Sequence, residues 1–204
     1  MASSSTSALS VEVMWEELPE KLLRQVLEHV MVRYGEMGWY GEKGWCSPLR
    51  GVSRRWRAVH DGVCQRLRMD DGVTDEVMHM LCGRLPALTF MSLRWVESLT
   101  EDGLRAVGGL TTLTELYLVE CPNVTDAVLR ELHGLTELAT LHIVFCTKVT
   151  DVGVRELRGL TTLTALHLHG CTHVTDVGIL HLTTLTKLTE LGVLYTSVTL
   201  GGTH

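Results

Sequence analysis

The sequence contains no long uninterrupted run of apolar residues. A membrane-spanning helix needs about 20 of them in succession, and no run in these 204 residues approaches that length. The first ten residues are rich in serine, but no basic segment followed by an apolar one marks a secretion signal. We therefore expect a disordered leader over residues 1–14, no association with a membrane, and a cytoplasmic or nuclear location.

Positive charge and catalytic motifs are also scarce. The 18 Lys and Arg against 24 Asp and Glu give a net charge of −6, which argues against nucleic acid as a partner. The sequence has no G-x-S-x-G, no phosphate-binding P-loop and no H-E-x-x-H. We expect a protein that is not an enzyme and that requires no cofactor or metal.

Aromatic residues make up only 5% of the chain, and they are unevenly distributed. Four of the five Trp precede residue 60: Trp15, Trp39, Trp45 and Trp56. The chain beyond residue 88 is instead rich in Leu and Thr. Two regions of different construction are indicated.

The second region is a repeat with a step of 25 residues. Its full copies read LTELYLVECPNVTDAVLRELHGLTE (113–137), LATLHIVFCTKVTDVGVRELRGLTT (138–162) and LTALHLHGCTHVTDVGILHLTTLTK (163–187). A related copy occupies 88–112, an earlier match begins near Leu67, and a last copy from Leu188 is incomplete. A fixed period of this length predicts a solenoid of about five units over residues 64–204.

The sequence of each unit predicts a strand, a turn and a helix, in that order. Leu116 and Leu118 lie two residues apart and point into the core from a short strand. Thr125 is expected to cap a helix, with Asp126 in its first turn, and Gly134 to end it as the C′ residue. The pattern L-x-x-L-x-L-x-x-C-x-x-V-T-D resembles the cysteine-containing leucine-rich repeat. The resemblance implies an α/β solenoid, with parallel strands on the concave face and helices on the convex face.

Six Cys would permit a disulfide framework, but such frameworks belong to short secreted chains. Cys121, Cys146 and Cys171 instead occupy one slot of the repeat. A buried thiol there can donate weakly to a carbonyl of the neighbouring coil. We interpret the three as a structural ladder; disulfides and a metal site are the alternatives.

The first region carries two helical segments over residues 15–63. WEELPEKLLRQVLEHV (15–30) has Pro at a suitable first position and one apolar face, and SPLRGVSRRWRAVHDGV (47–63) again opens with Ser-Pro. Together they resemble an F-box, a small helical domain. The matching residues are Leu18, Pro19, Leu22, Leu23, Val26, Leu27, Leu49, Val52, Ser53, Arg54, Trp56, Arg57 and Val59.

The chain departs from the F-box pattern in its spacer. Residues 31–46, MVRYGEMGWYGEKGWC, are longer than usual and rich in glycine and aromatics. This composition predicts a loop. Its aromatic rings either pack on the helices or remain exposed.

F-box proteins with leucine-rich repeats are substrate receptors of Skp1-cullin-F-box ubiquitin ligases. The resemblance implies that this chain binds a Skp1-like adaptor, and through it a cullin, and holds a target protein on its repeats. The alternatives are a repeat module that does not engage Skp1 and a small-molecule receptor. We expect the adaptor to contact Pro19, Leu22, Leu23, Val26 and Leu49; the alternative places these side chains in the core of the bundle.

The outward strand positions are the candidate target-binding surface, because they line the concave side of a solenoid. They are unusually apolar and aromatic, which is typical of an interaction site. The alternative is that Phe145 and Tyr195 turn inward and pack internally. The candidate residues are Trp95, Tyr117, Val119, His142, Val144, Phe145, His167, His169, Leu194 and Tyr195.

Three of these candidates are histidines that come together on adjacent strands: His142, His167 and His169. Imidazole is a common metal ligand, but no Asp, Glu or Cys in the outward positions is clearly arranged to complete a site. We interpret the histidines as polar recognition residues whose charge changes near pH 6–7.

Overall fold

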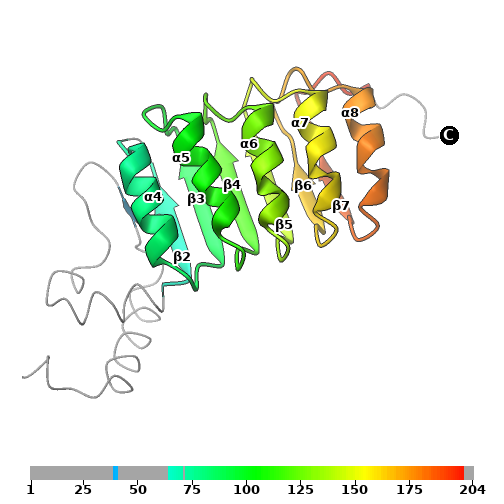
Figure 1. Cartoon of the computed structure of the whole chain (residues 1–204). Coiled ribbons are helices and arrows are strands. Elements are labelled where there is room, and N and C mark those ends of the chain that lie inside the picture. The colour runs from blue at the N-terminus through cyan, green and yellow to red at the C-terminus, as the bar shows by residue number, and fades with distance from the viewer. Residues whose placement is uncertain (1–38, 41–63, 71, 200–204) are drawn as a thin grey trace, which may run out of the picture.

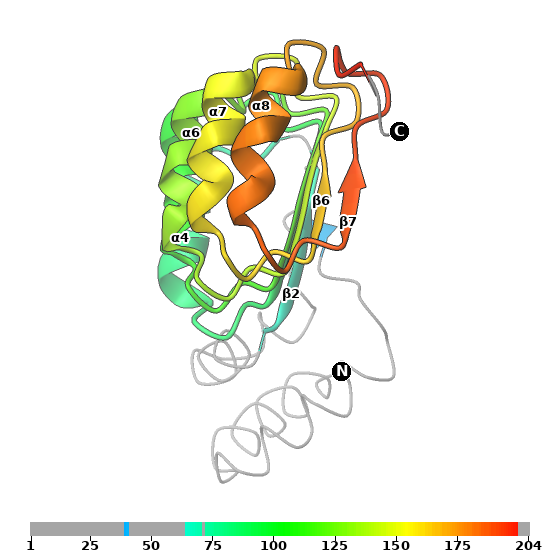
Figure 2. The same ribbon diagram turned by 90° about the vertical axis from the view of Figure 1, so that its right-hand side faces the viewer.

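The computed structural model describes residues 39–40, 64–70 and 72–199. Strands and helices alternate along these residues, with the helices in a row over one face of a single sheet (Figure 1). The view turned by 90° shows two layers, and none of the described helices covers the other face of the sheet (Figure 2). The predicted α/β repeat architecture is confirmed.

The seven strands found in the described part of the chain are parallel and lie in sequence order. They are β1 (Trp39–Tyr40), β2 (Arg66–Met69), β3 (Phe90–Arg94), β4 (Glu115–Val119), β5 (Thr140–Val144), β6 (Ala165–His167) and β7 (Glu190–Gly192). Residues one repeat apart are paired, as in Tyr117 with His142 and His142 with His167. The 25-residue step therefore sets the register.

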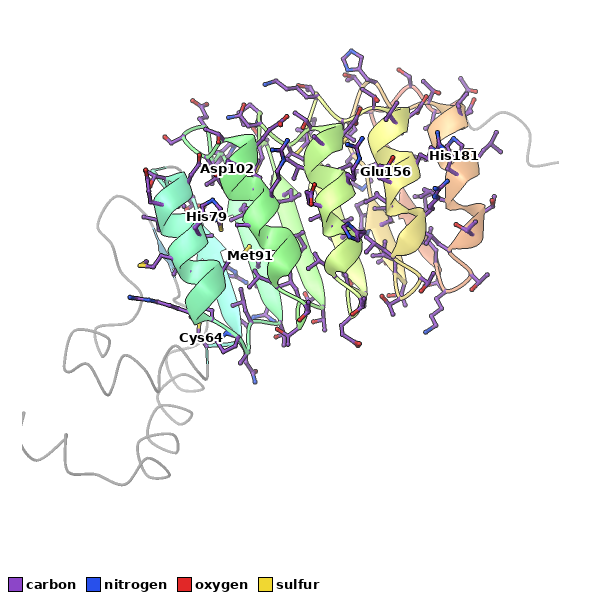
Figure 3. The ribbon with its side chains drawn as sticks, in the orientation of Figure 1. Cys64, His79, Met91, Asp102, Glu156 and His181 are labelled. Atoms are coloured by element: carbon purple, nitrogen blue, oxygen red, sulfur yellow. The ribbon has the colours of Figure 1, made fainter. Side chains whose placement is uncertain are left out.

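The helices are α4 (Asp75–Arg84), α5 (Glu101–Arg105), α6 (Asp126–Glu131), α7 (Asp151–Glu156) and α8 (Asp176–Leu180). All but α4 continue into short 3-10 helices: η2 (Ala106–Gly109), η3 (Leu132–Gly134), η4 (Leu157–Gly159) and η5 (His181–Thr184). On the outer side, His79 of α4 lies 3.0 Å from Asp102 of α5 (Figure 3). None of the described helices is long and apolar enough to cross a membrane.

One continuous apolar core runs between the sheet and the helices. Leu116 and Leu118 of β4 are buried in it, as the strand alternation predicts, and Val128 and Leu129 of α6 meet them from the helical layer. Met91 of β3 lies in the same layer of side chains (Figure 3). Each coil covers its neighbour's apolar side chains, so the units are stable only as a stack.

The prediction for Gly134 was wrong in its reason. α6 ends at Glu131, and Gly134 closes the following 3-10 turn without the left-handed conformation of a C′ glycine. A Cβ at Gly134 would lie 2.7 Å from the carbonyl oxygen of Gly108 in the preceding coil. The glycine permits close packing of neighbouring coils instead.

The cysteine slot forms the predicted ladder. The thiols of Cys121, Cys146 and Cys171 lie 3.5, 3.6 and 3.3 Å from carbonyl oxygens of the neighbouring coil. All three side chains are buried, and all five cysteines in the described residues are free thiols. The disulfide alternative is thereby excluded for the ladder.

The V-T-D motif joins the coils in a way that the sequence did not reveal. Asp126 accepts hydrogen bonds from the N–H (2.8 Å) and the hydroxyl (2.7 Å) of Thr150 in the next coil. Asp151 binds Thr175 in the same two ways, at 2.7 and 2.6 Å. Thr125 does occupy the N-cap position, but its hydroxyl donates to Glu101 and makes no capping bond.

β1 extends the sheet beyond the repeats that the sequence analysis identified. Trp39 and Tyr40 pair in parallel with Arg68 and Met69 of β2. These two residues belong to the segment 31–46, for which the sequence predicted a loop. At least this part of the segment 31–46 is therefore a strand of the repeat sheet.

Candidate functional site

A row of stacked rings crosses the uncovered face of the sheet, which we call the open face. The ring of Tyr117 lies 4.3 Å from that of His142, and the ring of His142 lies 4.2 Å from that of His167, both nearly parallel. Phe90 joins the row at 5.3 Å from Tyr117. We call these four side chains the ring row.

The ring row follows from the repeat itself. Tyr117, His142 and His167 occupy the same strand position in successive coils, and parallel strands lie about 4.8 Å apart, close to the spacing of stacked rings. Ser92 holds this position in β3 and is buried, so Phe90 supplies the ring from two residues earlier. The repeat pattern does not predict Phe90 in this row, because Phe90 holds a different strand position from the other three rings.

The basic end of the open face lies beside Phe90. The guanidinium carbon of Arg66 stands 3.9 Å from the ring centroid, and that of Arg68 stands 5.5 Å from it. Arg66 also lies 3.9 Å from the carboxylate of Glu115. Cations over a ring face are attracted by its electron density, so these arginines terminate the ring row.

At the other end, two histidines form a hydrogen-bonded chain with defined proton positions. The backbone N–H of Leu194 donates to Nδ1 of His169 at 3.0 Å, so a neutral His169 carries its proton on Nε2. That nitrogen lies 3.3 Å from Nδ1 of His167, to which it donates. Nε2 of His167 then donates to Glu190 at 3.3 Å. In this chain of hydrogen bonds Nδ1 accepts and Nε2 donates in both rings.

Gly192 makes room for this pair of histidines. A Cβ at Gly192 would lie 2.5 Å from Nδ1 of His167 and 2.6 Å from Nε2 of His169. Those are the two nitrogens that share the hydrogen bond. Gly192, which occupies in β7 the strand position that His167 holds in β6, is therefore part of the site.

Two of the three histidines, His142 and His169, have a lowered pKa. Desolvation, followed by the proximity of His167, lowers the pKa of His142 to about 4, and desolvation also lowers the pKa of His169. The interpretation that these charges change near pH 6–7 is therefore wrong for His142. Stacking removes water from the ring, and this disfavours the charged form. Among the described residues, no group of three or more His, Cys, Asp or Glu side chains could hold a metal ion.

The remaining candidates lie beside the ring row. Val119 and Val144 are half-buried, whereas Leu194 is exposed. Trp95, Phe145 and Tyr195 project where their strands end and are 47%, 49% and 77% exposed. The alternative in which Phe145 and Tyr195 pack internally is not what the structure shows.

The predicted adaptor-binding residues are not among the residues that the structure describes. Pro19, Leu22, Leu23, Val26 and Leu49 lie outside the described residues, as do the leader over 1–14 and most of the spacer over 31–46. The structure therefore places the candidate target-binding residues on one face and leaves the adaptor-binding set as a prediction.

Comparison with known proteins identifies the fold. No protein-family model and no curated protein sequence matches the chain. In the yeast Rad7–Elc1 complex, one chain aligns with 96% of this chain and 53% of its own length, with a TM-score of 0.58 and 16% identity.

Two further structures align with 66% of this chain. They are an internalin from Listeria monocytogenes (43% of its length, TM-score 0.42, 19% identity) and the plant peptide hormone receptor RGFR1 with RGF2 (20%, 0.41, 17%). The chain thus spans about half or less of the length of these three. With the parallel repeat geometry, the yeast likeness shows a leucine-rich-repeat fold.

Proposed function

We propose that this chain is the substrate-recognition subunit of a Skp1-cullin-F-box ubiquitin ligase, without catalytic activity of its own. The observation that carries the proposal is the ring row on an open face that no described helix covers. Tyr and Trp side chains are favoured anchors in protein interfaces, and an exposed apolar patch commonly marks one. The open face would hold the target protein.

The adaptor-binding half of the proposal is supported by the sequence before the repeats. Its F-box-like pattern directly precedes them, which is the order expected of a receptor that docks at one end and recognises a target at the other. One solved structure with a similar fold, that of Rad7, is a complex with a second protein, Elc1. We expect Leu22 and Leu23 to be the central adaptor contacts.

A pull-down with purified Skp1 and the full-length chain tests this half. We expect Skp1 to retain the wild-type chain and to lose the double variant Leu22→Asp with Leu23→Asp. Tyr117→Ala, on the open face, is the matched control and should bind Skp1 as the wild type does. Absence of wild-type binding, or undiminished binding of the double variant, would contradict the proposal.

A second candidate is a repeat module that binds a target without engaging Skp1. The specific observation in its favour is that Trp39 and Tyr40 of the spacer pair with β2. A spacer tied to the repeat sheet would place the two F-box-like helices differently from an ordinary F-box. The same pull-down separates the two candidates.

A further inference from the structure

Five residues follow the strands at the same slot of successive coils: Trp95, Glu120, Phe145, Gly170 and Tyr195. We call them the turn row. All five have positive φ, between 52° and 72°. This conformation costs an L-residue about 1–2 kcal/mol and suits glycine, as Gly170 illustrates. The chain nevertheless places three aromatic residues there.

Burial of the three aromatic side chains does not offset this conformational cost. Trp95 and Phe145 keep about half of their surface exposed, and Tyr195 keeps 77%. The turn of the repeat imposes this φ in all five coils, so the pointer to function is that exposed aromatic residues occupy three of these positions where glycine would avoid the cost. The three rings are therefore candidates for contacts with a partner.

The aromatics alternate with small or acidic residues along the turn row. The ring of Phe145 occupies the space that a Cβ at Gly170 would need, with ring atoms 2.2 to 2.8 Å from that position. Gly170 is thus required to seat Phe145. The guanidinium carbon of Arg94 lies 4.9 Å from the Trp95 ring centroid and supports the indole.

The spacing of the three anchors selects a ligand conformation. Alternate strands of a parallel sheet lie about 9.6 Å apart. A polyproline II helix advances about 9.3 Å in three residues and returns to the same side. Residues on one side of a β-strand recur at about 6.7 Å, and residues seven apart in an α-helix at about 10.5 Å. The polyproline II repeat fits best over both intervals.

The negative charge along the turn row favours a ligand that carries a positive charge. Glu120 lies between Trp95 and Phe145, is exposed, and makes no ion pair with any residue that the structure describes. Glu97, also exposed, follows Trp95 by two residues. A basic ligand residue between the first two anchors would complement these carboxylates.

We propose that the turn row binds a proline-rich segment in the polyproline II conformation, with every third residue on Trp95, Phe145 and Tyr195 and a basic residue near Glu120. Aromatic rows recognise such segments because the ligand is already ordered before it binds. This inference rests on the proposed target-binding role of the repeats and names the chemistry of the target segment.

Fluorescence polarisation with the full-length chain tests the proposal. The probe is a fluorescein-labelled peptide, Pro-Pro-Arg-Pro-Pro-Gln-Pro-Pro-Gln. One control replaces each Pro by Ala, and a second replaces Arg by Glu. We expect the probe to bind at least about tenfold more tightly than the alanine peptide, and more tightly than the glutamate peptide. Equal binding of the probe and the alanine peptide would overturn the proposal.

Variants then separate binding from folding. Trp95→Gly and Tyr195→Gly should each weaken probe binding about tenfold or more, while the thermal midpoint does not fall, because glycine relieves the positive φ. Trp95→Asn, which also tolerates this conformation, is the second variant should glycine perturb the fold. Glu120→Gln should remove the preference for arginine over glutamate. Unchanged probe binding by the folded Trp95 and Tyr195 variants would also overturn the proposal.

The peptide titration needs no adaptor, and the Skp1 pull-down needs no peptide. A chain that binds Skp1 through Leu22 and Leu23 but not the proline peptide would overturn the inference on the turn row alone. A chain that binds the peptide but not Skp1 would leave this inference in place and contradict the ligase role.

Discussion

The carboxylate of Asp126 lies directly over Gly153 of the next coil. A Cβ at Gly153 would stand 2.3 Å from Oδ1 of Asp126, the oxygen that accepts the backbone N–H of Thr150. Gly153 lies two residues after Asp151, the first residue of α7. Because it has no side chain, it leaves room for Asp126 of the preceding coil to accept both hydrogen bonds from Thr150. The same contact recurs between Asp151 and Gly178.

Gly153→Ala should destabilise the protein by about 2 kcal/mol, because the added methyl displaces Asp126 from charge-assisted hydrogen bonds. Urea denaturation measures the change. Gly159→Ala is the matched control, since a Cβ there would have nothing within 4 Å, and it should change stability by less than about 0.5 kcal/mol. Equal effects of the two substitutions would contradict this account of Gly153.

One coil varies the rule and predicts an energetic coupling. Glu101 replaces the aspartate and binds only the hydroxyl of Thr125, and the next coil has Val128 at the slot that is glycine at Gly103, Gly153 and Gly178. Glu101→Asp should be more destabilising with Val128 present than with Val128→Gly. A double-mutant cycle in urea should give a favourable coupling of about 1–2 kcal/mol, whereas additivity within about 0.3 kcal/mol would contradict it.

The low pKa of His142 predicts a loss of stability in acid. In the unfolded chain His142 has its ordinary pKa of 6.5 and is protonated below that pH, whereas in the folded protein its pKa is about 4. Its contribution is thus present above pH 6.5 and is lost as pH falls from 6.5 to 4. The titratable groups around it are Tyr117, His167, His169 and Glu190.

His142→Phe keeps a ring in the row but cannot titrate, so it isolates this effect. Between pH 7 and pH 4.5 the variant should lose roughly 1 kcal/mol less stability than the wild type, a value reduced for solvent screening of a partly exposed ring. Urea midpoints at the two pH values measure the difference. The same pH dependence in both proteins would refute the assignment.

The cysteine ladder predicts unreactive thiols. Burial raises the pKa of Cys171 to about 11, and the neighbouring Cys121 together with burial raises that of Cys146. The pKa of Cys121 is instead lowered by its contact with Cys146, so this thiol is protected by its complete burial alone. Alkylation with iodoacetamide at pH 8, followed by peptide mass spectrometry, should leave Cys121, Cys146 and Cys171 unmodified in the native protein. All six cysteines should react in guanidinium. Modification of the ladder thiols in the folded chain, or fewer than six reactive thiols in guanidinium, would contradict the ladder.

The repeat made much of the fold predictable. Because each coil covers the next, a 25-residue step fixes the strand order, the register, the buried leucines and the cysteine slot without further information. Contacts between side chains of different coils were harder to foresee. Two such contacts are the hydrogen bonds from Thr150 to Asp126 and the place of Phe90, instead of Ser92, in the ring row. Both depend on the side-chain conformation, which the strand register does not fix.

Strand alternation and a constant period leave one way to bury the leucines, so the stacking of coils and the set of outward residues follow from the order of the amino acids. The state of those outward residues depends on contacts between different coils. Stacking between rings whose centroids lie 4.2 to 4.3 Å apart holds His142 neutral, and the hydrogen bond from Leu194 fixes the proton of His169. The positive φ of Trp95, Phe145 and Tyr195 is likewise set by how each chain segment turns from its strand toward the next helix.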